Sequence, residues 1–197
     1  MYFDGEYRRI GTVDPRPLQQ AVAALPEAIW FEETHRQQVY PAHRQTHTVP
    51  LIFDPDMRHT DPSVRPAFHQ LQPVVAPVMA QIVAHFAESD RGDAAPGYFV
   101  RVLLARLIAG GNIGSHRDNG HSLSRAHRIH CPVVTNPAAQ FGIAGNVQHL
   151  GAGEIWEINN RKVHGVRNPG EEARIHLILD YVLPGETVHD PDGELVA

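Results

Sequence analysis

The stretch ARIHLILDYVL, residues 173–183, decides the fold of this chain because its apolar and polar side chains alternate with a period of two. One face carries Ile175, Leu177 and Leu179, and the other carries Arg174, His176, Ile178 and Asp180. This alternation is typical of a β-strand whose two faces meet different surroundings. We therefore predict a strand that buries its aliphatic face and sends Arg174 and His176 together to the opposite side.

Further segments between Gly97 and this strand carry a similar signal. They are short, rich in β-branched or aromatic residues, and separated by Gly, Asn and Pro. They comprise residues 98–108, 129–135, 140–143, 147–150, 153–159 and 163–167. Asn159-Asn160 and Gly145-Asn146 are predicted turns, the second of them in a short hairpin. This pattern predicts a mainly β fold with flanking helices, namely a jelly roll, the cupin-like double-stranded β-helix.

Two helices are predicted before these strands. The first follows Asp14 as its cap, has Pro17 in its first turn, and places an apolar stripe on one side. That stripe consists of Leu18, Ala21, Val22 and Leu25. The second runs from about Pro73 to Phe86, with apolar residues at three-to-four-residue spacing. Pro73 and Pro77 are then expected in its first turn, where backbone donors are unpaired in any case.

The length of 197 residues fits a single domain with a sizeable core. Residues 1–97 are expected to form a helical or mixed N-terminal part that packs on the barrel. Residues 98–183 are expected to form the jelly-roll core, and residues 184–197 a loosely ordered tail.

Charge and composition exclude several classes of partner. The formal net charge is -5 and arginines are scattered, which argues against a nucleic-acid-binding surface. No apolar stretch approaches the roughly 18 residues that span a bilayer, and the polar N-terminus does not resemble a secretory signal. The single cysteine, Cys131, rules out an intrachain disulfide framework and is expected to be a small buried residue. These features favour the cytoplasm, whereas nothing indicates an oligomeric state.

A candidate metal site lies in the same region as the strands. His116 and Asp118 in HRDNGH (116–121) are two residues apart, so an extended segment presents both to one ion. His164 would join them from a second strand. Two imidazoles and one carboxylate form the ligand face of non-heme Fe(II) oxygenases, with positions left open for co-substrate and O2. His121, just after Gly120, is the competing ligand candidate.

Arg174, ten residues after His164, bears on the identity of the metal. The same three ligands also suit catalytic Zn(II) with a bound water, which would make the protein a hydrolase or an isomerase. A hydrolytic zinc site has no use for a guanidinium, whereas the rigid fork of an arginine suits the carboxylate of a co-substrate. Arg174 therefore favours iron over zinc, and it also argues against a non-catalytic cupin-type metal-binding or sensor protein.

Three blocks of sequence around these residues carry a family resemblance. They are RIHCPVVTNP (128–137), GEIWEINNRKVHGV (153–166) and ARIHLILDY (173–181). They resemble the core blocks of the aspartyl/asparaginyl β-hydroxylase family of Fe(II)- and 2-oxoglutarate-dependent oxygenases, and the resemblance covers roughly residues 98–183. The animal branch lacks the metal-binding carboxylate. Because Asp118 is present, the chain is more similar to the bacterial branch with a complete triad, which includes proline hydroxylases.

The resemblance implies a function and a set of roles. The chain is expected to be a dioxygenase that hydroxylates an amino acid or amino-acid residue, using Fe(II), 2-oxoglutarate and O2. The substrate could be free, part of a peptide or tethered to a carrier. His116, Asp118 and His164 would hold the metal, and the filled carboxylate position favours hydroxylation over halogenation. Arg174 would bind the distal carboxylate of 2-oxoglutarate. Arg128 and His130 match positions near its metal-binding end, although Arg128 could equally hold the carboxylate of an amino-acid substrate.

Several other residues are assigned less specific roles. Arg106 is expected to be a surface or interface charge, and Trp156 is expected to lie in the core. The segment YPAHRQTHTVPLIF (40–53) contains His43, Arg44 and His47, which either contact the substrate or are ordinary surface residues.

Overall fold

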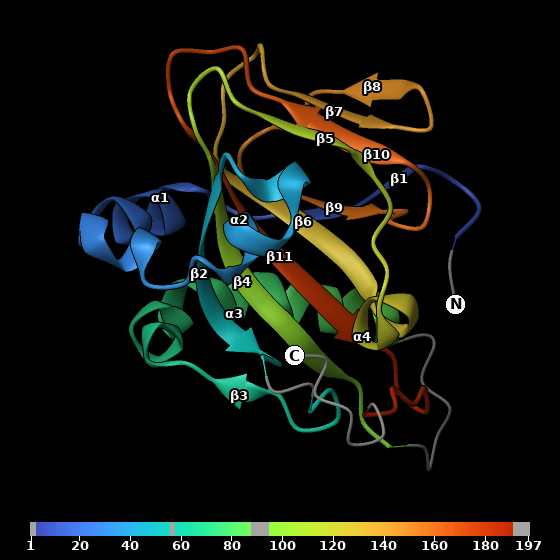
Figure 1. Ribbon diagram of the computed structural model, residues 1–197. Coiled ribbons are helices and arrows are strands. Elements are labelled where there is room, and N and C mark those ends of the chain that lie inside the picture. The colour runs from blue at the N-terminus through green and yellow to red at the C-terminus, as the bar shows by residue number, and fades with distance from the viewer. Residues whose placement is uncertain (1–2, 56–57, 88–94, 191–197) are drawn as a thin grey trace.

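Two antiparallel β-sheets face each other in the computed structural model, which describes residues 3–55, 58–87 and 95–190 (Figure 1). The larger sheet has the order β1-β9-β6-β11-β4-β2-β3. Its strands are β1 (Tyr7–Thr12), β9 (Glu154–Ile158), β6 (His127–Val134), β11 (Arg174–Val182), β4 (Tyr98–Leu107), β2 (Thr46–Phe53) and β3 (Ser63–Val64). The smaller sheet consists of β5 (Asn112–His116), β10 (His164–Arg167), β7 (Gln140–Ile143) and β8 (Asn146–Gln148), in that order. The predicted fold class, a double-stranded β-helix with flanking helices, is confirmed.

Strand β11 occupies the middle of the larger sheet, between β6 and β4, and has the two faces predicted from its alternation. Ile175, Leu177 and Leu179 belong to the main hydrophobic core. Arg174 and His176 lie together on the opposite face, where their side chains form a hydrogen bond. The strand therefore separates an aliphatic core on one side from a polar barrel interior on the other.

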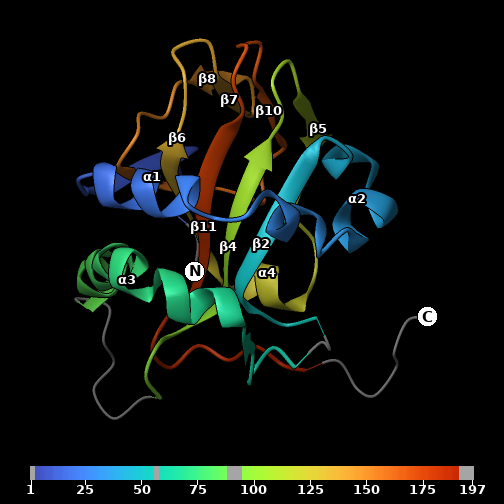
Figure 2. The ribbon, with the colours of Figure 1, turned by 90° about the vertical axis from the view of Figure 1, so that its left-hand side faces the viewer.

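Two helices, α1 (Arg16–Ala23) and α3 (Pro66–Phe86), cover the outer face of the larger sheet (Figure 2). Both place an apolar stripe against the aliphatic side of the strands, and this packing forms the main core. The buried residues of the two helices are Leu18, Val22, Leu71, Val75, Val78, Ile82 and Phe86. The predicted stripes are thus confirmed, whereas both predicted N-termini differ from the structure.

The longer helix begins at Pro66, so Pro73 and Pro77 lie in its interior. The prediction that they lie in the first turn is wrong. Each interior proline removes one helical hydrogen bond and crowds the carbonyl four residues before it. Both prolines are exposed, on the side away from the sheet. Burial of the apolar stripe on the other side stabilises the helix despite the two lost bonds.

The shorter helix has Pro15 and not Asp14 at its N-cap, and no side chain caps it. The carboxylate of Asp14 instead accepts the backbone N–H of Arg16 at 3.1 Å and pairs with the Arg16 guanidinium. Asp14 therefore stabilises the segment before the helix, because it lies one residue before the N-cap and not at the N-cap, where it was predicted.

The smaller sheet closes the mouth of the barrel around β10. A Cβ at Gly165 would lie 2.9 Å from the Ile113 carbonyl oxygen, so glycine allows β10 to approach β5 closely. The β7–β8 hairpin turns at Ala144 and Gly145, both with positive φ, so the turn lies one residue before the predicted Gly145-Asn146 pair. The predicted turn at Asn159-Asn160 is confirmed by the bond from Lys162 N–H to the Asn159 carbonyl oxygen.

The N-terminal part contributes strands as well as helices. Strands β1 and β2 pair with β9 and β4, so residues before Gly97 complete the larger sheet. The short helices of the N-terminal part are α2 (His35–Val39) and the 3₁₀ helices η1 (Glu27–Phe31) and η2 (Pro41–His43). They lie beside β2 and β5, while α4 (His121–Arg125) follows β5 (Figures 1 and 2).

The C-terminal tail is described as far as Asp190, and residues 191–197 lie outside the described ranges. In the described part, Val188 is buried, and the Asp190 carboxylate accepts bonds from the backbone N–H and hydroxyl of Thr60. Residues up to Asp190 therefore contact the rest of the domain, and the loosely ordered tail stays a prediction for residues 191–197. Among the described residues, no helix is both long and apolar enough to cross a membrane.

Candidate active site

His116 and His164 face each other across two neighbouring strands of the smaller sheet. They are paired in the register between β5 and β10, and their ring centroids lie 4.4 Å apart. Asp118 follows on the loop after β5, where its backbone N–H donates to the Asn160 carbonyl oxygen at 3.2 Å. The structure therefore brings together the three residues that the sequence analysis selected as metal ligands.

One ligand atom from each of these residues lies within 4.8 Å of the other two. His116 Nε2 is 3.7 Å from Asp118 Oδ1, and His164 Nε2 is 3.8 Å from Asp118 Oδ2. These distances are too long for hydrogen bonds. The three groups are therefore gathered without bonding one another, which is the arrangement that a shared metal ion requires.

Backbone carbonyls orient both imidazoles. His116 Nδ1 lies 2.8 Å from the Gly114 carbonyl oxygen, and His164 Nδ1 lies 3.0 Å from that of Lys162. A carbonyl oxygen only accepts, so each Nδ1 carries the proton and each Nε2 presents a lone pair towards Asp118. Such support fixes the tautomer of metal-binding histidines. The donor set and its orientation thus fit a divalent metal ion.

Asp118 is a nearly buried carboxylate in a field of positive charge. Burial alone would raise its pKa, but Arg128 and the two histidines outweigh burial and lower the pKa to about 2. Burial has the leading effect on His164, whose pKa is lowered so that its imidazole is neutral. The site therefore presents an ionised carboxylate and a neutral His164, the protonation states in which these groups bind metals.

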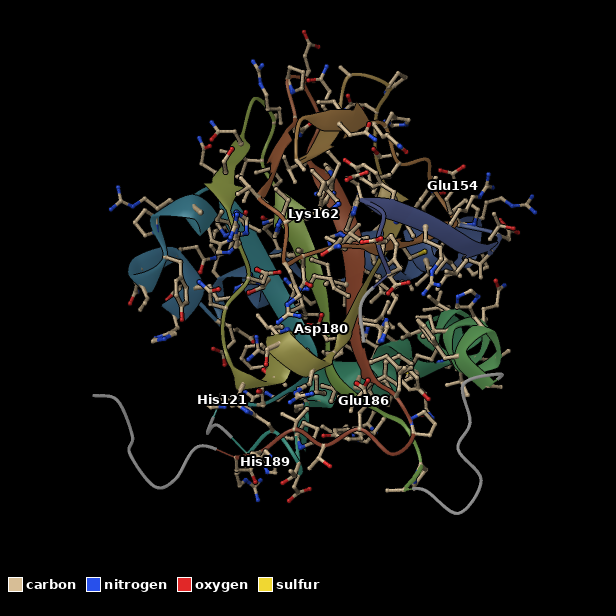
Figure 3. All side chains as sticks on the ribbon, turned by 90° about the vertical axis from the view of Figure 1, so that its right-hand side faces the viewer. His121, Glu154, Lys162, Asp180, Glu186 and His189 are labelled. Carbon is tan, nitrogen blue, oxygen red and sulfur yellow. The ribbon has the colours of Figure 1, made fainter. Side chains whose placement is uncertain are left out.

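Arg128 connects Asp118 to the barrel interior. Its Nε and Nη2 donate to the two oxygens of Asp180, each at 2.8 Å, and its Nη1 pairs with Asp118. Figure 3 shows Asp180 on β11 in the middle of the molecule. From the sequence, Arg128 was expected to bind either the co-substrate or the carboxylate of a substrate. The structure shows that the fork of Arg128 is occupied by Asp180, a partner that neither of these alternatives included.

Arg174 has a different environment, because no carboxylate contacts it among the described residues. Its side chain is buried, and its Nη2 donates to His176 Nδ1 at 2.7 Å. Its Cζ lies 5.7 Å from the centre of the Phe141 ring. Burial lowers the pKa of Arg174 to about 9. A buried cation without a counterion is unfavourable, so this position is suited to an anionic ligand.

His130 and His176 flank Arg174 in the interior. The guanidinium only donates, so His176 Nδ1 accepts, and the proton of this neutral imidazole is on Nε2. His130 Nδ1 lies 3.2 Å from the same His176 atom. Burial and then the charge of Arg174 keep the pKa of both histidines well below the ordinary value. The two neutral rings therefore line the site without neutralising Arg174.

An inner cavity joins Arg174 to the triad. Side chains from β2, β4, β5, β6, β7, β10 and β11 line it. They include His116, His130, His164, Arg128 and Arg174, together with Thr46, Phe141 and Ile178. Phe141 stacks on His164 at 6.3 Å and lies beneath Arg174, so it connects the two ends. The hydroxyl of Thr46 is buried and has no hydrogen-bond partner in the described structure. The sequence analysis missed the roles of Thr46 and Phe141.

An outer cavity of about 390 Å³ adjoins the inner one and shares Arg36, His43, His116, Arg128 and Ile178 with it. Loop residues that include Tyr40, Arg117 and Asn119 line its outer side. His121 also lines it, at the start of α4 near the lower edge of Figure 3, and is not part of the metal-ligand group. The competing ligand candidate therefore lies at the outer cavity and not among the grouped ligands.

The remaining predicted residues lie in different places. His43 reaches the site, with its ring 5.3 Å from that of His116. His47 instead contacts Phe31, and Arg106 pairs with Glu27 and lies over Trp30, both away from the two cavities. Cys131 is fully buried, and burial raises the pKa of its thiol to about 12, so the thiol is unreactive. Trp156, predicted to be in the core, is only partly buried and packs against a hydrophobic cluster that is separate from the main core.

A barrel that gathers two imidazoles and a carboxylate at its mouth, with open space beside them, has the architecture of a non-heme iron oxygenase. The chain belongs to the aspartyl/asparaginyl beta-hydroxylase family, which matches residues 67–184, more than half of its length. It is therefore a 2-oxoglutarate-dependent oxygenase by class. The resemblance seen in the three sequence blocks is confirmed.

Solved structures share the fold at low sequence identity. An oxidoreductase of the 2OG-Fe(II) oxygenase family from Burkholderia pseudomallei is 17% identical over 89% of this chain and 80% of that chain, with a TM-score of 0.62. A viral collagen prolyl hydroxylase from Paramecium bursaria Chlorella virus-1, solved with 2OG, is 10% identical over 90% and 96%, with a TM-score of 0.54. The nickel complex of the non-heme monooxygenase ThoJ is 14% identical over 92% and 76%, with a TM-score of 0.55. No curated protein sequence matches the chain.

Proposed function

We propose that this protein uses Fe(II) and 2-oxoglutarate to hydroxylate an amino acid or an amino-acid residue. His116, Asp118 and His164 would hold the iron, and Arg174 would hold the distal carboxylate of 2-oxoglutarate. When bound, iron and 2-oxoglutarate would supply the oxidation, in which the substrate, 2-oxoglutarate and O2 are converted to the hydroxylated substrate, succinate and CO2. The family match supports the general reaction, and the choice of substrate is the finer part of the proposal.

The observation that carries this proposal is the position of Arg174. It is buried, it has no carboxylate partner among the described residues, and it lines the same cavity as His116 and His164. 2-Oxoglutarate has one end that can bind a metal and a second carboxylate at the far end. A cavity with a metal-ligand group at one end and an uncompensated guanidinium at the other matches both ends.

The protein's own residues have supporting roles in this proposal. Arg128 pairs with Asp118 and also donates to Asp180 on β11, so it fixes the position of the Asp118 carboxylate relative to β11. The Gly114 and Lys162 carbonyls keep both imidazoles aimed at the ion. Phe141, Leu107 and Val166 make the inner cavity apolar around its polar ends, which excludes water from the reacting groups.

The size of the outer cavity supports a small substrate. Its volume of about 390 Å³ lies within the usual range for small-molecule sites. A free amino acid or a single side chain of a peptide would therefore fit beside the triad. These two alternatives correspond to the two kinds of substrate that the family resemblance implies.

The function is tested by measuring succinate formation with Fe(II), 2-oxoglutarate, ascorbate and O2, in a panel of free amino acids and short peptides containing Asp or Asn. Mass spectrometry should find one added oxygen atom on the productive substrate. His164→Ala should lose bound metal and all succinate formation, while the control His121→Ala should keep its metal stoichiometry. Metal binding without any succinate would favour a metal-binding or sensor protein, and turnover by His164→Ala would contradict the ligand assignment.

A further inference from the structure

Arg36 lies on α2 at the junction of the two cavities and has no role in the site described above. It lines both the inner and the outer cavity, whereas Arg174 lines the inner cavity alone. The segment that carries it, α2 and η2, lies beside β2 and β5 at the margin of the larger sheet (Figures 1 and 2). Arg36 is therefore placed to contact a molecule in the outer cavity.

The contacts of Arg36 orient its guanidinium without neutralising it. Nη2 lies 3.2 Å from His43 Nε2, the one hydrogen bond found for this side chain in the described structure. Because a guanidinium only donates, His43 must accept through Nε2 as a neutral ring. Burial and the charge of Arg36 hold the pKa of His43 at about 3, which keeps that ring neutral. Most of the five N–H donors of Arg36 are therefore available to a ligand.

The other arginines of the outer cavity differ from Arg36 in this respect. Arg101 pairs with Asp54, and Arg128 pairs with Asp118 and Asp180. Arg117 is exposed to solvent, where an unpaired charge costs little. Arg36 combines partial burial with the absence of a carboxylate partner among the described residues. Burial, followed by the like charge of Arg128, lowers the pKa of Arg36 to about 10.

We propose that Arg36 binds a carboxylate of the substrate and thereby selects carboxylic acids for the outer cavity. The position between the cavities places this carboxylate at the junction, beside His43 and His116, while 2-oxoglutarate occupies the inner cavity against Arg174. The planar fork of an arginine matches a carboxylate through two parallel hydrogen bonds, and an amide of the same shape can make only one of them. This inference rests on the proposed function, since it assigns the substrate of that same site.

The test compares acids with their amides in protein that cannot turn over. Zn(II)-loaded protein with saturating 2-oxoglutarate is titrated in a calorimeter with two matched pairs of probes. The first pair is L-proline and L-prolinamide, and the second is N-acetyl-L-aspartic acid α-amide and N-acetyl-L-asparagine α-amide. In at least one pair, the wild-type protein should bind the acid about tenfold or more tightly than the amide, as expected for a charge-assisted contact.

Arg36→Gln should weaken binding of the preferred acid by about tenfold to a hundredfold and leave binding of its amide nearly unchanged. Arg36→Lys should recover part of the preference, because it restores the charge but not the fork. Arg65→Gln is the matched control, since Arg65 is a surface arginine already paired with Glu33. An unchanged affinity for 2-oxoglutarate in Arg36→Gln shows that the variant is folded and that its inner cavity is intact.

Two outcomes would overturn the inference. One is equal affinity for acid and amide in both pairs, including the absence of binding by either acid. The other is a loss of 2-oxoglutarate affinity in Arg36→Gln with the acid preference intact, which would assign Arg36 to the co-substrate. Failure of the proposed function is a separate result, because the protein would then form no succinate even if acid binding still depended on Arg36.

Discussion

The uncompensated charge of Arg174 gives the sharpest prediction for a single residue. Arg174→Ala removes the guanidinium from a buried pocket, and such a truncation reduces the binding free energy of a charged ligand by about 2–5 kcal/mol. The affinity for 2-oxoglutarate should therefore fall by about thirtyfold or more. Arg174→Lys should recover only part of the loss. Titration of 2-oxoglutarate into the Fe(II)-loaded protein without oxygen, followed by the charge-transfer absorption band, measures this.

Metal affinity should change little in the same variants, because Arg174 is not among the grouped ligands. Arg106→Ala serves as the control, since it removes an arginine of the same sheet that pairs with Glu27 away from the cavities. Equal 2-oxoglutarate affinity in Arg174→Ala and the wild-type protein would remove the co-substrate role of this arginine.

The unpartnered hydroxyl of Thr46 predicts a smaller effect on the same ligand. Thr46 and Arg174 are both paired with Leu107, from opposite sides of β4, so they lie in one row across the sheet. Loss of one hydrogen bond in Thr46→Val should weaken 2-oxoglutarate binding roughly two- to tenfold. Thr48 is two residues further along β2, on the same face as Thr46, and does not line the inner cavity. Thr48→Val should therefore leave the affinity for 2-oxoglutarate unchanged. The reverse order of effects in the same titration would show that Thr46 does not contact the ligand.

The metal ligands could be predicted from the sequence, whereas the residues around them could not. His116 and Asp118 are adjacent enough in the chain for their spacing alone to place them on one ion, and His164 lies within a recognisable block. Thr46 and Phe141 come from strands whose position depends on the order of both sheets, which local periodicity does not encode. Arg36 lies in a short helix of the N-terminal part, where the family resemblance was thin.

Among the elements, α3 has Pro73 and Pro77 in its interior, whereas the sequence placed both in the first turn. Pro77 is exposed in the helix interior, so Pro77→Ala restores a backbone donor without changing the buried stripe. Removal of the interior proline stabilises the folded helix, and this gain in free energy exceeds the loss that arises because the unfolded chain becomes more flexible. The free energy of unfolding should therefore rise by about 1–2 kcal/mol. For a chain of this size, the melting temperature should increase by a few degrees, at about 2–4 °C per kcal/mol.

Pro66→Ala is the matched control for this change, because Pro66 occupies the first turn, where its missing N–H has no helical partner. Thermal unfolding of the two variants should therefore separate them. A lower melting temperature for Pro77→Ala than for Pro66→Ala would mean that the packing of α3 on the sheet requires proline at position 77.

The strands after Gly97, except β5, were predicted to within a few residues because each alternates or is β-branched between clear turn residues. Strand β5 was not predicted, since its residues, Asn112–His116, are mostly exposed and neither alternate nor are rich in β-branched residues. Strand β1 was missed, since its residues are mostly half-buried and show no regular alternation. The polar beginning of β2 gives no strand signal, because Thr46 and Thr48 are buried polar residues on one face and His47 contacts Phe31 on the other. The start of α3 was missed because prolines normally mark the beginning of a helix.

At the scale of the whole molecule, two buried histidines predict sensitivity to mild acid. Burial lowers the pKa of His130 and His176 well below the ordinary value, so the folded protein keeps both neutral. The unfolded chain protonates both below about pH 6.5, so the stability they confer is complete above that pH and is lost as the pH falls. Between pH 7 and 5.5, the loss should be about 1.3 kcal/mol for each histidine.

Urea unfolding of the metal-free protein between pH 8 and 5.5 measures this dependence. The free energy of unfolding should be nearly constant from pH 8 to 7 and then fall. His176→Gln should remove about 1.3 kcal/mol of this fall, whatever its effect on stability at pH 8, and part of the fall should remain because His43 and His164 also have lowered pKa values. A free energy of unfolding that stays level down to pH 5.5 would show that these histidines take up protons in the folded state.

The two cavities lie in series, with Arg36, His43, His116, Arg128 and Ile178 forming the wall between them and exposed loop residues on the outer side only. A molecule seated in the outer cavity therefore covers this side of the inner one. For ligands that pass through the outer cavity, whatever binds at Arg174 enters first, and the product formed from it leaves last. Accumulated hydroxylated product would then slow the enzyme by detaining succinate behind it, as well as by competing with fresh substrate.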